Sequence, residues 1–128
     1  MGADMSEESF ARLVRLAREA GLPEVEQSTS YGDPALKVGD KGFVTLKGAA
    51  VAALRIPMEQ KDFLLEVAPE IYFETDHYKG WPWLLVRLEI IADAELTQRL
   101  VDAWRFRAPR KLAAAFRAPG PRGSTGSP

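Results

Sequence analysis

The sequence Glu74-Thr-Asp-His-Tyr-Lys-Gly-Trp-Pro-Trp83 leads directly into the apolar run Trp83-Leu-Leu-Val-Arg-Leu-Glu-Ile-Ile91. Side chains in the run alternate, because Arg87 and Glu89 interrupt only one side of it. Alternation of this kind is typical of a strand with one buried face. The fully apolar side is predicted to hold Leu84, Val86, Leu88 and Ile90. We therefore expect residues 83–91 to be the main strand, with a second face that is partly open to solvent or to a partner.

The ten residues from Glu74 to Trp83, which lead into this strand, hold an unusual concentration of binding groups. They contain the only histidine, two of the three tryptophans and one of the three tyrosines. Interleaved Gly80 and Pro82 predict a shaped loop instead of a strand interior. Aromatic faces beside Lys79 and Arg87 can stack on bases or hold a phosphate backbone. Alternatively, Tyr78 and Trp83 pack into the core. The candidate motif loop comprises His77, Tyr78, Gly80, Trp81 and Trp83.

Outward from this loop, periodicity and turn residues predict the other elements. Helical spacing and end signals predict helices over 6–20 and 58–67, a helix that begins at Asp93 and breaks at Pro109, and a last basic segment over 110–117. Extended segments are expected within 25–38 and at 43–47, 50–56 and 71–74, separated by tight turns that favour antiparallel neighbours. The sequence thus predicts an α+β fold, with about five antiparallel strands flanked by helices in the order α-β-β-β-α-β-β-α-α.

Length and composition bound the organisation of the chain. With 128 residues, of which 46% are hydrophobic, we expect one domain over 6–117 with a sufficient core. Residues 1–5 are expected to be a flexible lead. Residues 118–128 contain no core-forming side chain and predict a disordered tail.

The charge is unevenly distributed along the chain. Seven basic residues and one acid lie between Arg99 and Arg122, so this part carries +6 while the whole chain carries −1. Such a split is a hint of an anion-binding end. Alternatively, these cations simply complement the C-terminal dipole of a helix.

Several classes of site find no support in the composition. The chain has no cysteine, which excludes disulfides and thiolate sites and fits a reducing compartment. No apolar run is long enough to span a bilayer and the first residues are acidic, so we expect a cytoplasmic protein without membrane contact. Its glycines are scattered and form no phosphate-binding loop.

His77 invites three interpretations. With Glu74, Asp76 and Tyr78 it could bind a metal, but neighbouring residues of an extended chain point to opposite sides. A triad could combine it with Ser28 or Ser30 and with Asp33 or Asp76, but no nucleophile elbow accompanies them. The favoured role is a histidine that fixes the loop by hydrogen bonds. We therefore expect no catalytic residue, no metal and no cofactor.

Three motifs in order resemble the MmcQ/YjbR family of small bacterial proteins. The first is Glu26-Gln-Ser-Thr-Ser-Tyr-Gly-Asp-Pro-Ala-Leu-Lys-Val-Gly-Asp-Lys-Gly-Phe43, and the second is Thr75-Asp-His-Tyr-Lys-Gly-Trp-Pro-Trp-Leu-Leu-Val-Arg-Leu88. The third combines Ala103-Trp104 with Ala108-Pro-Arg-Lys-Leu112. The resemblance implies a curved antiparallel sheet, similar to secretion-chaperone-like proteins. It also implies DNA binding by a double-wing arrangement of hairpins, with no established catalytic residue.

Two functions follow as expectations. The first is binding of double-stranded DNA, with hairpin turns such as Gly39 to Gly42 entering a groove. The phosphate contacts would come from Lys79, Arg87, Arg105, Arg107, Arg110, Lys111 and Arg117. The pI of about 5.9 is low for such a protein. The second is a protein-interaction module whose sheet receives an extended peptide or a second copy of itself.

Overall fold

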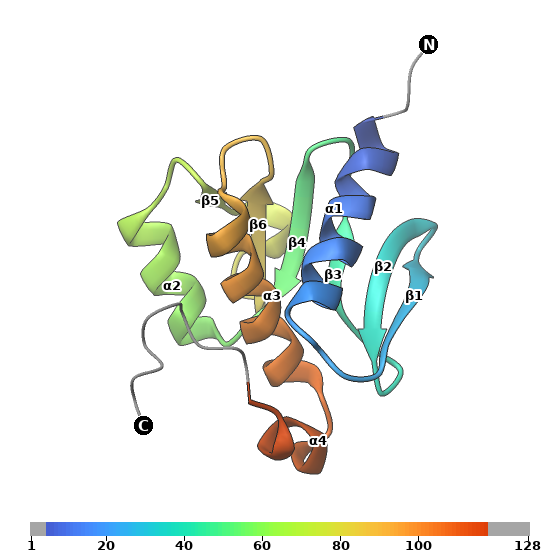
Figure 1. Ribbon diagram of the computed structural model, residues 1–128. Helices are drawn as coiled ribbons and strands as arrows, with labels where there is room; N and C mark the ends of the chain where they lie inside the picture. The colour runs from blue at the N-terminus through green and yellow to red at the C-terminus, as the bar shows by residue number, and fades with distance from the viewer. Residues whose placement is uncertain (1–4, 118–128) are drawn as a thin grey trace.

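A computed structural model describes residues 5–117 (Figure 1). The helices are α1 (Met5–Glu19), α2 (Met58–Val67), α3 (Asp93–Arg107) and α4 (Arg110–Ala115), with a 3-10 turn, η1, at Asp76–Tyr78. The strands are β1 (Val25–Ser30), β2 (Asp33–Val38), β3 (Lys41–Leu46), β4 (Val51–Arg55), β5 (Tyr72–Phe73) and β6 (Trp83–Arg87). The tail predicted for 118–128, and the predicted lead except for Met5, lie outside the described residues.

The described strands form one antiparallel sheet in the order β1-β2-β3-β4-β6-β5. The α+β class is confirmed, but the sheet has six strands where about five were expected. The additional strand comes from 25–38, which forms a complete hairpin. Tyr31 and Gly32 at its turn have φ values of 50° and 86°, as in a two-residue type I′ turn that lets strands pair up to the turn itself.

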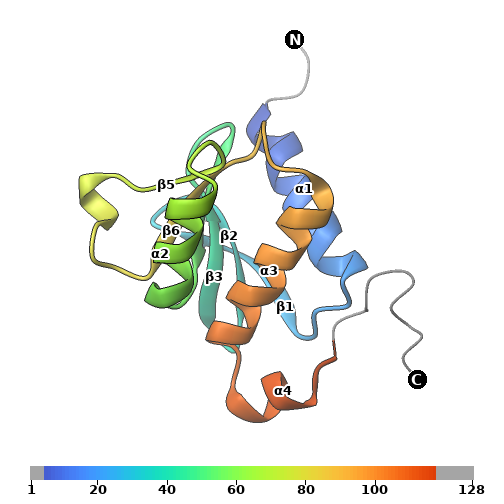
Figure 2. The same ribbon diagram turned by 90° about the vertical axis from the view of Figure 1, so that its left-hand side faces the viewer.

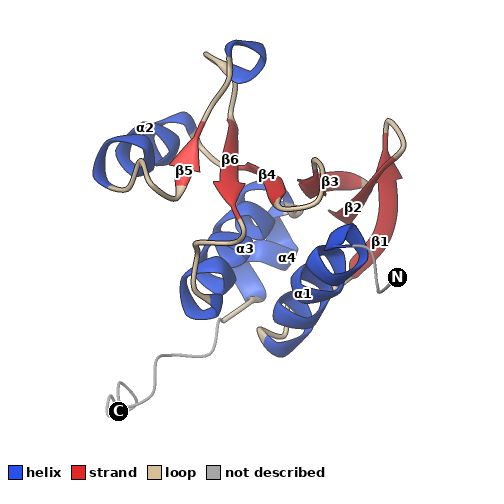
Figure 3. Ribbon diagram, turned by 90° about the horizontal axis from the view of Figure 1, so that it is seen from above, coloured by secondary structure: helices blue, strands red, loops and turns tan. Residues whose placement is uncertain are grey.

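Helices α1 and α3 cover one face of the sheet, and α2 lies beside the edge strand β5 (Figure 3). The core lies beneath α1 and α3. The helical spacing of Leu96, Leu100, Ala103 and Trp104 predicts one buried stripe on α3, and all four side chains are buried. No helix within residues 5–117 combines the length and apolar content needed to cross a membrane.

The opposite sheet face, which we call the open face, bears mostly small side chains at its centre. Strand register places Ala35, Thr45, Ala53 and Leu85 in one row across β2, β3, β4 and β6. They are buried, although α1 and α3 lie on the other side. Some other part of the chain must therefore shield this row.

The predicted alternation fails at the end of the main strand. Strand β6 ends at Arg87, and the backbone N–H groups of Ile90 and Ile91 both donate to the carbonyl of Arg87. This turn reverses the expected pattern, so Ile90 is 53% exposed while Ile91 is buried. A helical-type turn changes the side-chain period from two, which a strand pattern cannot anticipate.

Candidate binding surfaces

The motif loop supplies the missing cover of the open face. Between β5 and β6 the chain bulges away from the sheet on the side opposite α1 and α3 (Figure 2). The turn η1 places His77 and Tyr78 over the sheet, and both contribute to a hollow together with Thr45 and Ala53.

A buried lysine on α2 fixes this loop. The ammonium of Lys61, whose residue is fully buried, donates to the carbonyl oxygens of Tyr78 at 2.9 Å and Trp81 at 2.7 Å. It also forms an ion pair with Glu74 at 2.9 Å. All three donor positions of the ammonium are thereby matched to acceptors at both ends of the loop. Helix α2 therefore determines where the loop sits.

His77 does not have the loop-fixing role that was predicted for it. Its side chain is exposed and its ring meets the edge of Tyr78, with centroids 5.0 Å apart. Among the hydrogen bonds of residues 5–117, none comes from the His77 imidazole. Sequence analysis did not identify Lys61, because a lysine in a helix is ordinarily exposed. The signal that could have revealed its burial is helical spacing, because Leu64 and Leu65 lie three and four residues after Lys61.

Burial of Lys61 goes with an unexpected orientation of α2. The sequence predicts that Phe63, Leu64 and Val67 share a buried face, yet Phe63 and Val67 are 60% and 53% exposed. The helix instead buries Lys61 and Leu64. The side of α2 that bonds the motif loop thus faces inward, and Phe63 and Val67 face outward.

Tyr78 and Trp83 line a hollow on the open face, with ring centroids 6.1 Å apart. The hollow has a volume of about 170 Å³. Its other walls come from Ser30, Tyr31, Thr45, Lys47, Ala53 and His77. Neither aromatic ring joins the core beneath the helices, as one alternative proposed, because both pack on the open face. Trp81 is 63% exposed and lines an adjoining shallow depression with His77, Tyr78 and Trp83.

Lys47 is the cation of the hollow. Its ammonium lies 2.9 Å from the carboxylate of Asp33. The hydrogen bond to Asp33, with a smaller contribution from Tyr78, raises the pKa of Lys47. Because Asp33 is engaged by Lys47, it does not orient His77. Ser30 and His77 border the same hollow, but no hydrogen bond joins them in the described part of the chain.

At the lower end of the molecule in Figure 1, the β2–β3 turn, the end of β4 and the end of α3 lie near α4. We call the cations that these segments carry the basic end: Lys41, Arg55, Arg107, Arg110 and Lys111. The β2–β3 turn packs on the start of α4 here. A Cβ placed on Gly39, whose φ is +57°, would lie 3.1 Å from the Pro109 ring. The guanidinium of Arg107 donates to the carbonyl of Gly42 at 3.0 Å.

Two arginines of the basic end lack acidic partners. Arg55 lies over the Trp83 ring at 4.9 Å, and its Nε is buried without a hydrogen-bond acceptor. Burial, and then repulsion from Arg107, lowers the pKa of Arg55, and burial lowers the pKa of Arg107. Within residues 5–117 neither guanidinium is in a salt bridge. Two neighbouring, uncompensated cations favour an anionic ligand.

The other residues that were predicted to contact phosphates lie in different parts of the structure. Arg110, Lys111 and Arg117 are exposed on and after α4, and Arg105 lies over the Phe116 ring at 5.2 Å. Arg87 is at the opposite end of β6 from Trp83, where it covers Phe73 at 4.2 Å. Lys79 is exposed beside Gly80 on the motif loop. The C-terminal cations therefore gather, whereas Arg87 lies apart from them at the far end of β6.

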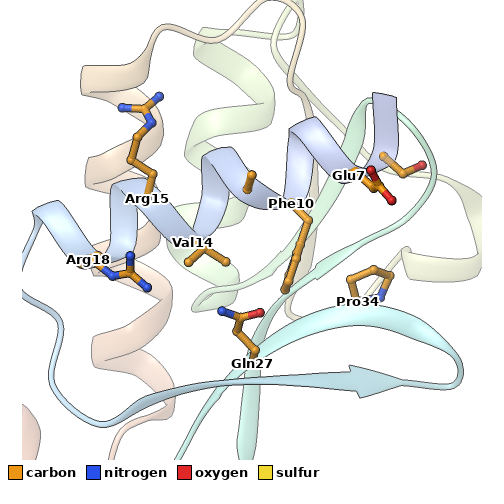
Figure 4. Close-up of a pocket in the computed structure, with 9 residues that line it drawn as sticks. Glu7, Phe10, Val14, Arg15, Arg18, Gln27 and Pro34 are labelled. Carbon is orange, nitrogen blue, oxygen red and sulfur yellow. The ribbon is translucent and has the colours of Figure 1, made fainter. Parts of the chain in front are cut away.

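Sequence analysis also missed a groove between α1 and the β1–β2 hairpin (Figure 4). Phe10 and Val14 point from α1 toward Gln27 and Pro34 on the strands, and Arg18 lies at one end. Its volume is about 590 Å³. It arises because α1 reaches the sheet edge without covering β1, a relation that neither element's own pattern encodes.

Metal binding was also considered for the motif loop. Within residues 5–117, no three histidine, aspartate or glutamate side chains come together in a group that could hold a metal ion.

Comparison with known proteins places these surfaces in a family context. Residues 20–106 match the family model described as YjbR. Uncharacterized proteins from Mycobacterium bovis and from two strains of Mycobacterium tuberculosis are each 33% identical over 89 residues. The alignment covers 65% of this chain and 69% of each relative. The resemblance identified from the sequence motifs is confirmed.

Proposed function

This chain belongs to the YjbR family, and we propose that its basic end binds the phosphates of double-stranded DNA without catalysing a reaction. The observation that carries the proposal is the packing of the β2–β3 turn, through Gly39, on Pro109 at the start of α4. This contact joins a hairpin turn narrow enough to approach a groove with the cations of α3 and α4.

The charge of this surface supports the proposal. Asp40 is the only acid within residues 38–43 and 105–117. Arg107 is positioned by its bond to Gly42, while Arg110 and Lys111 are exposed and able to reach phosphates. The local excess of positive charge matters more for DNA contact than the overall pI. The proposal removes Arg87 from the predicted phosphate contacts, because Arg87 lies at the opposite end of β6 from Trp83.

Fluorescence anisotropy with a labelled duplex, measured over a series of salt concentrations, tests this function. The double variant Arg110→Gln/Lys111→Gln removes two exposed cations without opening the core. If both contact phosphates, the slope of log K against log salt should become shallower by about 2. Lys79→Gln, which removes an exposed cation of the motif loop, is the control. Absence of binding at low salt, or equal slopes for the double variant and wild type, would overturn the proposal.

The groove favours a second candidate function, which is self-association through β1. This strand is at the sheet edge, and its outer backbone groups have no strand partner within residues 5–117. Antiparallel pairing of β1 with a second copy, centred between Gln27 and Ser28, would place Glu26 opposite Thr29 and oppose no like charges. The edge is therefore compatible with a symmetric dimer beside the apolar groove.

Sedimentation over a range of protein concentrations tests this alternative. Thr29→Glu would set a carboxylate opposite Glu26 across the pairing and should weaken the dimer. A monomer at every concentration, or a dimer that Thr29→Glu leaves unchanged, would exclude β1 pairing.

A further inference from the structure

The open-face hollow and the basic end are continuous. Arg55 belongs to the basic end, yet its guanidinium covers Trp83, which is a wall of the hollow. Strand register explains the contact, because Arg55 and Trp83 are direct partners on β4 and β6. A phosphate backbone bound along the basic end would therefore reach the aromatic hollow at Arg55.

The two arginines of this route, Arg55 and Arg107, form no salt bridge with a carboxylate in the described part of the chain. Asp33 is engaged by Lys47, and Glu74 by the buried Lys61. Among the described residues, Arg55 also keeps a buried N–H without an acceptor. A buried donor without an acceptor is costly. A bound anion that reorients the guanidinium can remove this cost.

The size and chemistry of the hollow select the kind of group that enters it. At about 170 Å³ it is smaller than the 300–1,000 Å³ typical of pockets for complete small molecules. It offers the rings of Tyr78 and Trp83 for stacking and the hydroxyls of Ser30 and Thr45 for hydrogen bonds. These features fit one planar, polar-edged ring of a longer chain, and a nucleobase is such a ring.

We propose that the open-face hollow binds an unpaired nucleobase of single-stranded DNA whose phosphates lie on Arg55 and Arg107. The inference rests on the proposed function, because the same basic end supplies the phosphate contacts. It adds a preference for single strands over duplexes, since a base paired within a duplex cannot leave its stack to enter the hollow without an energetic cost. Single strands should therefore bind more tightly than duplexes of the same length.

The test uses a fluorescein-labelled oligothymidine of about twelve nucleotides and a duplex of equal length at matched salt. Tyr31→Asn removes an aromatic wall at a fully exposed position, and asparagine tolerates the φ of 50° found there. Ala53→Leu fills the hollow from its floor, with thermal unfolding measured to verify folding. Phe63→Ala, on the exposed side of α2, is the matched control for loss of a surface aromatic.

The wild type should bind the single strand about tenfold more tightly than the duplex, and tryptophan fluorescence should be quenched as bases stack. Tyr31→Asn should lower single-strand affinity about fivefold, which is the scale of one weak stacking contact. Duplex affinity should not change, and Phe63→Ala should have no effect on either substrate.

Equal affinities for the two substrates would overturn this inference while leaving the duplex proposal intact. The inference would also be overturned if Tyr31→Asn and folded Ala53→Leu both bound the single strand as tightly as the wild type does. Failure of both substrates to bind would overturn the inference together with the proposed function.

Discussion

The ammonium of Lys61 lies 2.7 Å from the carbonyl oxygen of Trp81, twenty residues further along the chain. This bond, with those to Tyr78 and Glu74, ties a helix to the loop that covers the open face. The loop contains two glycine or proline positions and little regular structure of its own. Lys61 is therefore the buried side chain that adds to the loop's own backbone hydrogen bonds and holds it to α2.

Replacing this lysine should destabilise the protein strongly. Lys61→Met keeps the length of the side chain but removes the ammonium from the Glu74 carboxylate and from the carbonyls of Tyr78 and Trp81, which keep only their backbone donors. We expect a loss of about 3 kcal/mol in the free energy of unfolding, as for a broken buried ion pair whose carboxylate can still reach water. Urea unfolding measures it, with the exposed Lys79→Met as control. Equal stabilities of the two variants would show that Lys61 does not hold the loop.

The contact between Gly39 and Pro109 predicts a difference between two glycines. Gly39→Ala and Gly32→Ala both place a side chain at positive φ, which costs about 1 kcal/mol or more in each. Only at Gly39 does the new Cβ also meet a neighbour, the Pro109 ring, whereas nothing lies within 4 Å at Gly32. Gly39→Ala should be the less stable variant and the only one that weakens duplex binding. Identical unfolding curves would contradict this packing.

The ion pairs of Asp93 at the junction of α1 and α3 should make the stability of the fold sensitive to acid. Hydrogen bonds from Arg12 at 2.7 Å and Arg15 at 3.2 Å lower the pKa of its carboxyl group from the usual 3.8. A lowered pKa in the folded state stabilises the protein above about pH 4, and the contribution is lost as the pH falls through the folded value. Asp93→Asn should reduce stability at pH 7 and flatten its decline in acid. Thermal unfolding from pH 7 to pH 2 measures both effects, with exposed Asp62→Asn as control.

The buried Tyr72 should make the stability of the fold decline as the pH rises above about 10. Burial, and then its 2.5 Å hydrogen bond to Glu95, raises the pKa of the phenol above the usual 10.0. Because the folded protein holds this proton more tightly, the contribution is complete below about pH 10 and is lost as the pH rises toward the folded value. Tyr72→Phe should lower stability at pH 7 by about 2 kcal/mol, since Glu95 loses its donor. It should also reduce the decline above pH 10. An unchanged alkaline decline would show that another group controls it.

The motif loop illustrates how far sequence predicted the candidate site. The concentration of His77, Tyr78, Trp81 and Trp83 identified the correct segment, and Gly80 and Pro82 correctly indicated a loop. The residues that complete the site, Lys47, Arg55 and Lys61, were not found. Each is an ordinary lysine or arginine within its own element, and only its neighbours on other elements distinguish it.

The basic end was also predicted only in part from the sequence. Its charge excess predicted an anion-binding end, and the helix break at Pro109 was correct. Which cations gather, however, depends on where α3 ends relative to the β2–β3 turn. Arg107 meets Gly42 across 65 residues of sequence, whereas Arg87 is carried to the far end of β6.

The sequence by itself determined the α+β class, the family, most element positions and the buried stripe of α3. These follow from side-chain period, turn residues and local motifs, which act within one element or between neighbours in the chain. Only the tertiary structure decided which side of α2 is buried, how the loop covers the open face, and that the hollow joins the basic end through Arg55. These relations depend on strand register and on hydrogen bonds between distant segments, whose energies exist only once the elements have packed.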